Sequence, residues 1–232
     1  MIGDILGDTW GMYTKHFTHF VPIAAVFFLI LSAIALALAL LLGWIGAVAS
    51  FVVTIIGIFW LQGTLVEAIA DVRDGRADMS IGETYAKARP YIFTLLGAGI
   101  LATVGIVIGL ILLIVPGLIL LTWWSLIIPV IVLEKLGVMD SFGRSRELVR
   151  GNGWNVFGVI VITAILIGIA SNIVRVIFLW LPGGLDYYVG NVVANSLLAP
   201  IAAIAWTLMY YRLARADAGL EQTAPSTDPA PS

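Results

Sequence analysis

Two long stretches without a charged residue constrain this chain more than any other feature of its sequence. No Asp, Glu, Lys or Arg lies between Lys15 and Glu67, and none lies between Arg89 and Glu134. A helix of about 20 apolar residues crosses the hydrocarbon core of a bilayer. Each stretch is therefore long enough for two membrane-crossing helices joined by a short turn, and we expect an integral membrane protein.

The composition of the whole chain supports this expectation. Of its 232 residues, 61% are hydrophobic and 11% are charged, whereas soluble domains carry about 25% charged residues. A chain of this length has too small an interior to hide so much apolar surface from water. A net charge of −2 argues against a nucleic acid as a partner. The absence of cysteine excludes disulfides and thiolate chemistry.

We expect an all-α fold with six transmembrane helices arranged as three hairpins. Proline and glycine end helices, because proline lacks a backbone N–H and glycine accepts left-handed dihedral angles. Such residues mark the expected hairpin turns, at 43–46, at Pro116-Gly117 and at 182–184. The six predicted spans then cover about residues 20–42, 47–70, 91–114, 118–133, 154–180 and 188–211.

The membrane domain is predicted to comprise residues 1–216. Residues 217–232 are predicted to form a disordered tail, because they are rich in Pro, Ser and Ala and lack apolar periodicity. Every Lys and Arg of the chain except Arg175 falls on the side of the predicted spans that also holds both termini. Because positively charged residues stay in the cytoplasm, we expect both termini and this tail to be cytoplasmic.

A short amphipathic segment precedes each predicted hairpin, at residues 2–17, 80–92 and 138–150. In each segment, apolar residues recur at spacings of three and four, which is typical of a helix with one apolar face. We expect these helices to lie at the cytoplasmic membrane interface with the apolar face towards lipid. Ser80 and Glu83 form the S-x-x-E pattern of a capping box, which indicates a helix that begins after Ser80.

The three amphipathic segments also share a local pattern. An apolar residue, a glycine, a charged residue and a Thr or Ser occur as Leu6-Gly7-Asp8-Thr9, Ile81-Gly82-Glu83-Thr84 and Phe142-Gly143-Arg144-Ser145. We interpret the chain as a threefold repeat whose unit is an interfacial helix, a span, an uncharged turn and a second span. The alternative is that so short a match arises by chance.

Cationic residues cluster around the third amphipathic segment: Lys135, Arg144, Arg146 and Arg150. Cationic side chains beside a membrane attract anionic lipids, by about 1 kcal/mol each. One hypothesis is therefore that this cluster binds an anionic lipid headgroup or a membrane-protein partner. The alternative is that these residues only set the topology of the chain.

Two carboxylates, Glu67 and Glu134, lie near the cytoplasmic ends of the second and fourth predicted spans. Carboxylates within a membrane are costly and often functional. The interfacial position of these two instead favours ion pairs with Arg73, Lys135 or Arg144. Their similar places in two repeats indicate a structural latch between a span and an interfacial helix.

Arg175 is the one basic residue predicted on the outer side. It shares a helix face with Ser171 and Asn172, and Asn191 and Asn195 follow across the next turn at the same i and i+4 spacing. These five residues are the candidate lining of a polar cavity that opens to the outside. Alternatively, Arg175 snorkels to the outer interface or pairs with the nearby Asp186, and the asparagines only join helices.

Catalytic motifs are absent from the sequence. It contains no G-x-S-x-G elbow and no P-loop. Its two histidines, His16 and His19, have no carboxylate cluster beside them, so we expect no metal site and no cofactor. We also expect a protein that is not an enzyme, because an intramembrane enzyme would need an acid–base pair that the sequence lacks.

Residues 123–162 resemble a known group of bacterial membrane proteins. The pattern within this segment consists of Pro129, Glu134, Ser141, Arg144, Ser145, Leu148, Arg150, Asn152, Gly153 and Trp154. The N-terminal stretch also looks similar, through Trp10, Tyr13 and Phe17. It is similar to the membrane domain that precedes some bacterial glycerophosphoryl diester phosphodiesterases, and to related stand-alone membrane proteins. Only about 20 residues follow the last predicted span, whereas a catalytic barrel takes about 250 residues. The resemblance therefore implies the membrane module without the enzyme, in the inner (plasma) membrane of a bacterium.

Two functional hypotheses follow from these patterns. The leading one is a non-enzymatic membrane module whose cytoplasmic helices bind anionic lipids, a membrane-protein partner or a second copy of the chain. The alternative is a transporter or lipid-translocating protein that uses the polar cavity around Arg175. The two differ in the site they need, a basic surface at the cytoplasmic interface or a polar cavity inside the membrane.

Overall fold

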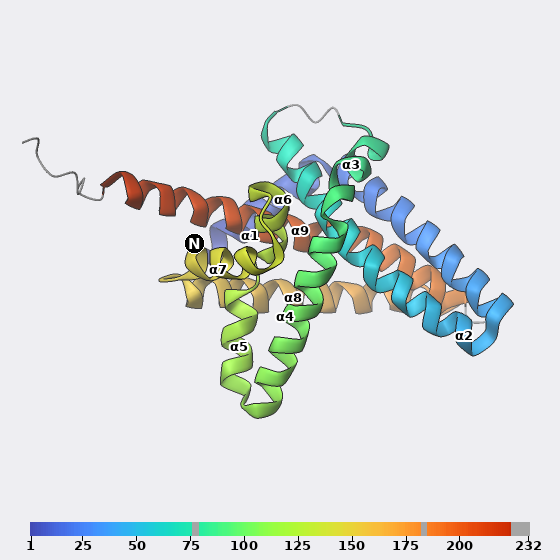
Figure 1. The fold of residues 1–232 in the computed structure, drawn as a ribbon. Coiled ribbons are helices and arrows are strands. Elements are labelled where there is room, and N and C mark those ends of the chain that lie inside the picture. The colour runs from blue at the N-terminus through green and yellow to red at the C-terminus, as the bar shows by residue number, and fades with distance from the viewer. Residues whose placement is uncertain (76–78, 182–184, 224–232) are drawn as a thin grey trace, which may run out of the picture.

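The computed structural model describes residues 1–75, 79–181 and 185–223, and over these residues it is all-helical (Figure 1). Its helices are α1 (Ile2–Lys15), α2 (Phe17–Arg73), α3 (Ile81–Ala88), the 3-10 turn η1 (Arg89–Tyr91), α4 (Ile92–Leu112), α5 (Ile114–Trp123), α6 (Ile127–Glu134), α7 (Val138–Val149), α8 (Gly153–Ile177) and α9 (Leu185–Thr223). Five helical segments of the described residues are long and apolar enough to cross a membrane: Phe17–Arg73, Ile81–Leu112, Ile114–Glu134, Gly153–Ile177 and Tyr188–Gly219. The predicted class, an all-α membrane protein, is therefore confirmed.

α2 reverses its direction at Gly43, whose dihedral angles (φ 55°, ψ −127°) are not helical. Glycine suits this position because side chains rarely tolerate a positive φ. The two halves of α2 fold back along each other (Figure 1). They approach so closely that a Cβ atom at Gly46 would collide with the carbonyl group of Leu38, and one at Gly57 would lie 2.7 Å from the Phe27 ring. The reversal lies within the turn predicted at 43–46.

The chain reverses between α4 and α5 at Leu113, which is extended (φ −159°, ψ 135°). The turn predicted at Pro116-Gly117 is therefore misplaced. Pro116 lies in the first turn of α5, where a helix tolerates proline because the missing N–H would have no helical partner. Gly117 instead permits close packing, since a Cβ atom at Gly109 of α4 would lie 3.0 Å from the Gly117 Cα atom.

The fourth predicted span, 118–133, is not a single helix, because α5 ends at Trp123 and α6 begins at Ile127. Ser145 of α7 supplies hydrogen bonds at this break. Its hydroxyl donates to the carbonyl oxygen of Trp123 (2.7 Å) and accepts from the N–H of Leu126 (3.2 Å). A short helix later in the chain therefore stabilises the interruption.

α8 and α9 occupy the regions of the fifth and sixth predicted spans. The turn predicted at 182–184 lies outside the described residues. α9 continues to Thr223 and so enters the segment predicted as a disordered tail. Asp217, the first residue after the predicted boundary, is helical and pairs with Arg144 at 2.8 Å. Residues 224–232 of that predicted tail lie outside the described residues.

The short helices α1, α3 and α7 lie away from the tips of the α2 and α4–α5 hairpins, which diverge from this end of the molecule (Figure 1). We call this end, formed by α1, α3, α6 and α7, the base. The capping box predicted at Ser80 is confirmed, because the Ser80 N–H donates to Glu83 (2.8 Å) and the Glu83 N–H donates to the Ser80 hydroxyl (3.3 Å). The predicted lipid-facing stripes instead dock on protein: Ile5 and Thr9 of α1 are buried, and α1 packs on α8 and α9.

Many large apolar side chains are buried towards the base, whereas those at the tips of the hairpins are exposed. Phe20, Leu65 and Leu126 are almost fully buried. At the tips, by contrast, Leu41 is 80% exposed and Ile111 is 77% exposed. Large apolar patches are unfavourable in water, so these tips require a lipid environment.

Candidate functional site

Arg144 of α7 is held by carboxylates from three helices. Its Nε atom lies 3.1 Å from Glu134 Oε2, and its Nη1 atom lies 2.8 Å from Asp217 Oδ2 and 3.7 Å from Glu147 Oε2. Tyr210 of α9 donates a further hydrogen bond to Glu134 (2.9 Å). Partial burial opposes the charge of Arg144, but hydrogen bonds to Asp217 and Glu134 outweigh it and raise the pKa of the guanidinium. Arg144, predicted as a lipid contact, therefore clamps α6, α7 and α9 together.

Glu67 of α2 lies 3.6 Å from the Nζ atom of Lys87 on α3. This ion pair joins α2 to α3 as the Arg144 clamp joins α6 to α7. Arg73, a predicted partner for Glu67, instead stacks on the ring of Tyr211, with its guanidinium carbon 3.8 Å from the ring centre. Both predicted latch carboxylates thus pair with the amphipathic helix that comes next in the chain, Glu67 with α3 and Glu134 with α7.

A third ion-paired junction, which was not predicted from the sequence, joins α9 to α1. Arg212 of α9 donates hydrogen bonds to Asp4 (3.2 Å) and to Asp8 (2.7 Å) of α1. Asp8 occupies the same place in the shared four-residue pattern as Arg144, with the charges of the pair reversed. That pattern was the signal from which a role for Asp8 could have been predicted.

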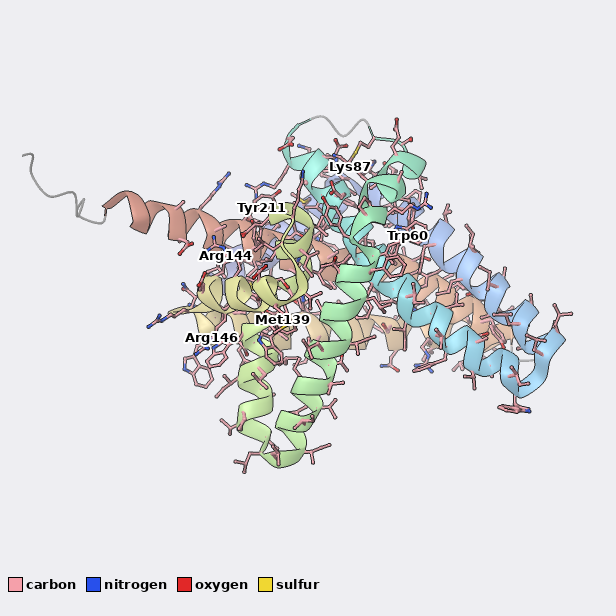
Figure 2. The ribbon with its side chains drawn as sticks, viewed as in Figure 1. Trp60, Lys87, Met139, Arg144, Arg146 and Tyr211 are labelled. Atoms are coloured by element: carbon pink, nitrogen blue, oxygen red, sulfur yellow. The ribbon has the colours of Figure 1, made fainter. Side chains whose placement is uncertain are left out.

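Arg146 leaves α7 on the side opposite Arg144 (Figure 2), since residues two apart on a helix point in nearly opposite directions. Its guanidinium carbon lies 4.3 Å from the centre of the Trp123 ring, in cation–π contact. Beside this ring is a pocket of about 490 Å³, lined by Trp123, Gly143, Arg146, Glu147 and Arg150. Lys135, exposed in a left-handed conformation at the end of α6 (φ 56°), does not line it. We call this space the cationic pocket.

An apolar groove of about 600 Å³ meets the same tryptophan between α5 and the start of α8. Its side walls are formed by Val115, Leu118, Ile119, Thr122, Trp123, Trp154 and Phe157. Gly151, Asn152 and Gly153 line it where α8 begins, and no side chain among the described residues caps that helix. A helix N-terminus carries a partial positive charge and N–H groups that bind anions. Trp123 thus connects a cationic pocket to an apolar groove.

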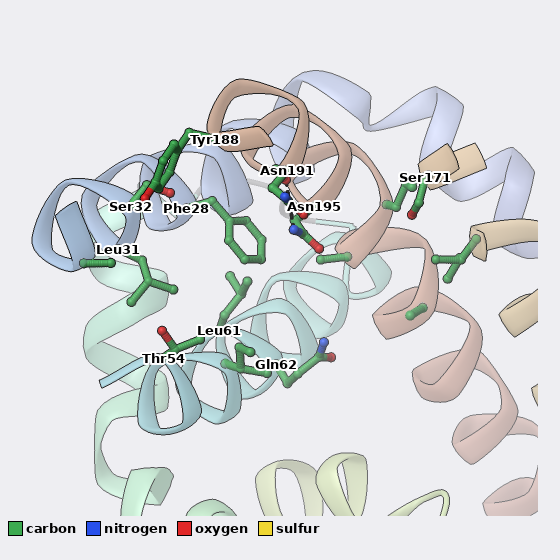
Figure 3. A pocket seen from close by; sticks show the side chains of 16 residues that line it. Phe28, Leu31, Ser32, Thr54, Leu61, Gln62, Ser171, Tyr188, Asn191 and Asn195 are labelled. Atoms are coloured by element: carbon green, nitrogen blue, oxygen red, sulfur yellow. Dashed lines mark hydrogen bonds between the residues drawn. The ribbon is translucent and has the colours of Figure 1, made fainter. Parts of the chain in front are cut away.

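A second groove, of about 470 Å³, lies between the two halves of α2 and the helices α8 and α9 (Figure 3). Phe28 and Leu61, one from each half of α2, face Asn191 and Asn195 of α9 across it (Figure 3). Its polar lining comes from Ser32, Thr54, Gln62, Ser171, Tyr188, Asn191 and Asn195. We call this space the polar groove. Three of the five predicted cavity residues therefore meet here, together with α2 residues that the sequence analysis did not single out.

The other two predicted cavity residues, Asn172 and Arg175, are exposed and do not line the polar groove. The Asn172 side-chain amide donates to the carbonyl oxygen of Gly168 (2.8 Å). The backbone of α9 approaches α8 beside Arg175, because a Cβ atom at Gly190 would lie 3.6 Å from the Arg175 Cα atom. The predicted alternative was an ion pair between Arg175 and Asp186. The side chain of Asp186 lies outside the described part of the structure.

Neither a metal site nor a known relative directs the assignment of function. Within the described ranges, no three His, Cys, Asp or Glu side chains gather into a group that could hold a metal ion. No protein-family model, no curated protein and no solved structure matches this chain. Function is therefore argued from the pockets and their chemistry.

Proposed function

We propose that this protein is a multi-pass membrane protein that binds an anionic phospholipid at its base. The lipid phosphate lies between Arg146 and Arg150, and one acyl chain follows the apolar groove between α5 and α8. The observation that carries this proposal is the stacking of Arg146 on Trp123 at 4.3 Å. It sets a cation at the junction of a charged pocket and an apolar groove, the two environments that a phospholipid occupies.

Local charges in the cationic pocket favour an anion. Glu147 is the one carboxylate among the lining residues, and it already pairs with Arg144 at 3.7 Å. Arg146 and Arg150 therefore leave the pocket with a net positive charge. Stacking on Trp123 also holds the planar Arg146 guanidinium in place, which reduces the entropy lost when it binds a phosphate. The proposed role is non-enzymatic.

We also propose that the chain crosses the membrane six times, as three hairpins related by a threefold repeat in which each half of α2 is one crossing. The Thr or Ser that ends the shared pattern is buried in every copy, at Thr9, Thr84 and Ser145. The residue four positions later is also buried in every copy: Tyr13, Ala88 and Val149. The three ion-paired junctions follow the same order, each joining the end of one repeat to the short helix of the next, and the α9–α1 pair closes the cycle.

The proposed location is the inner membrane of a bacterium, with the base and both termini in the cytoplasm. The distribution of lysine and arginine supports this orientation, because Lys87, Lys135 and Arg146 belong to the base or its helix ends, and Arg212 of α9 pairs with α1 of the base. The bacterial location rests on the resemblance to the membrane domain of some bacterial glycerophosphoryl diester phosphodiesterases and to related stand-alone membrane proteins.

Single cysteines test this orientation, and the lack of native cysteine keeps the background low. A cysteine replacing Leu113, which is 67% exposed at the tip of the α4–α5 hairpin, is expected to react with a membrane-impermeant maleimide added to intact spheroplasts. A cysteine replacing Met139, which is 71% exposed on α7, should react only after permeabilisation. Labelling at position 139 but not at 113 in intact spheroplasts would contradict the orientation.

Replacing Arg146 and Arg150 together by alanine is expected to weaken the binding of phosphatidylglycerol about thirtyfold. Each cation near a lipid phosphate contributes about 1 kcal/mol, and 1.4 kcal/mol corresponds to a factor of ten in affinity. Native mass spectrometry of the full chain, titrated with phosphatidylglycerol in a neutral detergent, measures this change. Trp123→Leu, which removes the stacking surface, is expected to weaken binding about threefold.

Arg89→Ala is the matched control for the lipid experiment. Arg89 is an exposed arginine at the end of α3, and its replacement changes the net charge by the same amount per residue without altering the cationic pocket. Phosphatidylglycerol binding by Arg89→Ala should stay within about twofold of the wild type. Equal binding by the wild type and the Arg146→Ala/Arg150→Ala variant would refute the proposed lipid site.

A further inference from the structure

The polar groove has a lining that hydrocarbon cannot satisfy. It lies between α2, α8 and α9, three helices that carry membrane-crossing segments. Hydroxyl and carboxamide groups that face hydrocarbon without a partner are strongly destabilising. A space of about 470 Å³ whose lining includes the hydroxyl oxygen of Thr54 and the side-chain carbonyl oxygen of Asn195 therefore favours water or a polar molecule at these oxygens over an acyl chain.

The polar lining of this groove carries no formal charge. Its polar side chains are hydroxyls and carboxamides, and no Asp, Glu, Lys or Arg among the described residues lines it. A phosphate, a carboxylate or an ammonium group would therefore enter without a counter-ion. Burying an unpaired charge is much more costly than burying a neutral polar group, so the lining selects an uncharged ligand.

Local hydrogen bonds leave acceptor oxygens in the groove. The Thr54 hydroxyl donates to the carbonyl oxygen of Ser50 (2.7 Å), and the Asn195 amide donates to that of Asn191 (2.9 Å). Thr54 has thereby used its donor, and Asn195 one of its two N–H donors, while the hydroxyl oxygen and the side-chain carbonyl oxygen can still accept. A ligand that donates hydrogen bonds, such as one with hydroxyl groups, matches this arrangement.

Apolar side chains complete the wall of the groove. They come from all three helices: Phe28, Leu31, Ile58, Leu61, Ile167 and Leu198. In Figure 3 Tyr188 and Ser32 lie towards one end of the space and Gln62 towards the other, with Phe28 and Leu61 between them. A ligand that fills this space therefore contacts both polar and apolar surface.

We infer that the polar groove binds an uncharged, hydroxyl-bearing molecule whose less polar part packs on Phe28 and Leu61. The hydroxylated head belongs either to a neutral lipid of the bilayer or to a free polyol. Its hydroxyls donate to Thr54 and Asn195 and meet the carboxamide of Gln62. This site is separate from the cationic pocket, so the inference goes beyond the proposed phospholipid binding and does not depend on it.

Two asparagines of the chain provide a matched test. The side-chain amides of Asn195 and Asn172 both donate to the carbonyl oxygen four residues earlier, at 2.9 and 2.8 Å, but only Asn195 lines the groove. The full chain in neutral detergent is titrated with dioleoylglycerol and, separately, with sorbitol, and loading is read by native mass spectrometry. The wild type and Asn172→Leu are expected to load one of these probes, and Asn195→Leu to bind it about fivefold more weakly, because one hydrogen bond is lost.

Gln62→Leu is a second variant for the case in which Asn195→Leu fails to fold. It removes a polar group of the groove from a different helix and is expected to weaken loading by a similar factor. Loading of dioleoylglycerol assigns the head to a neutral lipid, and loading of sorbitol assigns it to a free polyol; either supports the inference. No loading of the wild type by either probe, or equal loading of the wild type, Asn195→Leu and Gln62→Leu, overturns it. The Arg146→Ala/Arg150→Ala variant should load the probe like the wild type, which separates this site from the phospholipid site.

Discussion

Gly46→Ala is expected to lower the free energy of unfolding by about 3 kcal/mol, the upper end of the usual cost of overpacking. A Cβ atom at Gly46 would collide with the carbonyl group of Leu38 in the facing half of α2. A backbone carbonyl cannot rotate away as a flexible side chain can. The two halves of α2 would therefore have to separate, and with them the reversal at Gly43. Size-exclusion chromatography of heated samples in detergent should show a clear fall in the midpoint of thermal unfolding.

Gly168→Ala is the control for this prediction. Gly168 also lies in a membrane-crossing helix, but a Cβ atom there would meet nothing within 4 Å, and its φ is not positive. Because alanine favours helix more than glycine does, this variant should unfold at or slightly above the wild-type temperature. An unfolding midpoint for Gly46→Ala equal to that of Gly168→Ala would mean that the close approach within α2 does not support the fold.

The sequence predicted those features of the fold that depend on local chemistry. Long charge-free stretches predicted membrane-crossing helices, and the S-x-x-E pattern predicted the start of α3 at Ser80. The turn predicted at 43–46 contains the reversal at Gly43, because glycine marks positions of unusual backbone conformation. In each case, the residues that determine the structure are neighbours in the chain.

Two features that the sequence did not predict depend on contacts between distant residues. α5 and α6 are separate helices because the hydroxyl of Ser145 bonds to backbone groups of Trp123 and Leu126. α9 extends beyond the predicted boundary, and its Asp217 reaches Arg144 on α7. Pairings between residues so far apart in the chain are not encoded in any local pattern.

The candidate sites show the same limit. The sequence identified cationic residues near α7 but not that Arg144 is used within the protein while Arg146, two residues on, stacks on Trp123. It identified Asn191 and Asn195 but not their neighbours from α2. Ser32, Thr54 and Gln62 are isolated polar residues in apolar segments of the sequence. Only the packing of α2 against α8 and α9 joins them to Ser171, Tyr188, Asn191 and Asn195 in one groove lining.

Arg144→Met is expected to destabilise the protein by about 2 kcal/mol. The substitution keeps an unbranched side chain in place but leaves Glu134 and Asp217 without their cation. Removing one partner of a fully buried ion pair costs about 3–5 kcal/mol. The side chains of Arg144 and Glu134 are 28% and 23% exposed, so water screens part of that cost.

A double-mutant cycle with Glu134→Gln separates the ion pair from the loss of packing. Glu134→Gln removes the charge that Arg144 neutralises, and the glutamine can still accept a hydrogen bond from Tyr210. The double variant should therefore be more stable than the sum of the two single changes predicts, with a coupling energy of about 1 kcal/mol, within the usual range for residues in contact. Unfolding by SDS titration in mixed micelles provides the four free energies.

Arg89→Met is the control for this cycle, because Arg89 is exposed at the end of α3 and surface changes usually alter stability by less than about 0.5 kcal/mol. If Arg144→Met and Arg89→Met were equally stable, the contacts of Arg144 with Glu134 and Asp217 would not hold α6, α7 and α9 together. A loss confined to Arg144→Met, and partly recovered by Glu134→Gln, would instead place the stability of the base in this clamp. The proposed phospholipid site would then depend on this clamp indirectly, because the helix that carries Arg144 also positions Arg146 over Trp123.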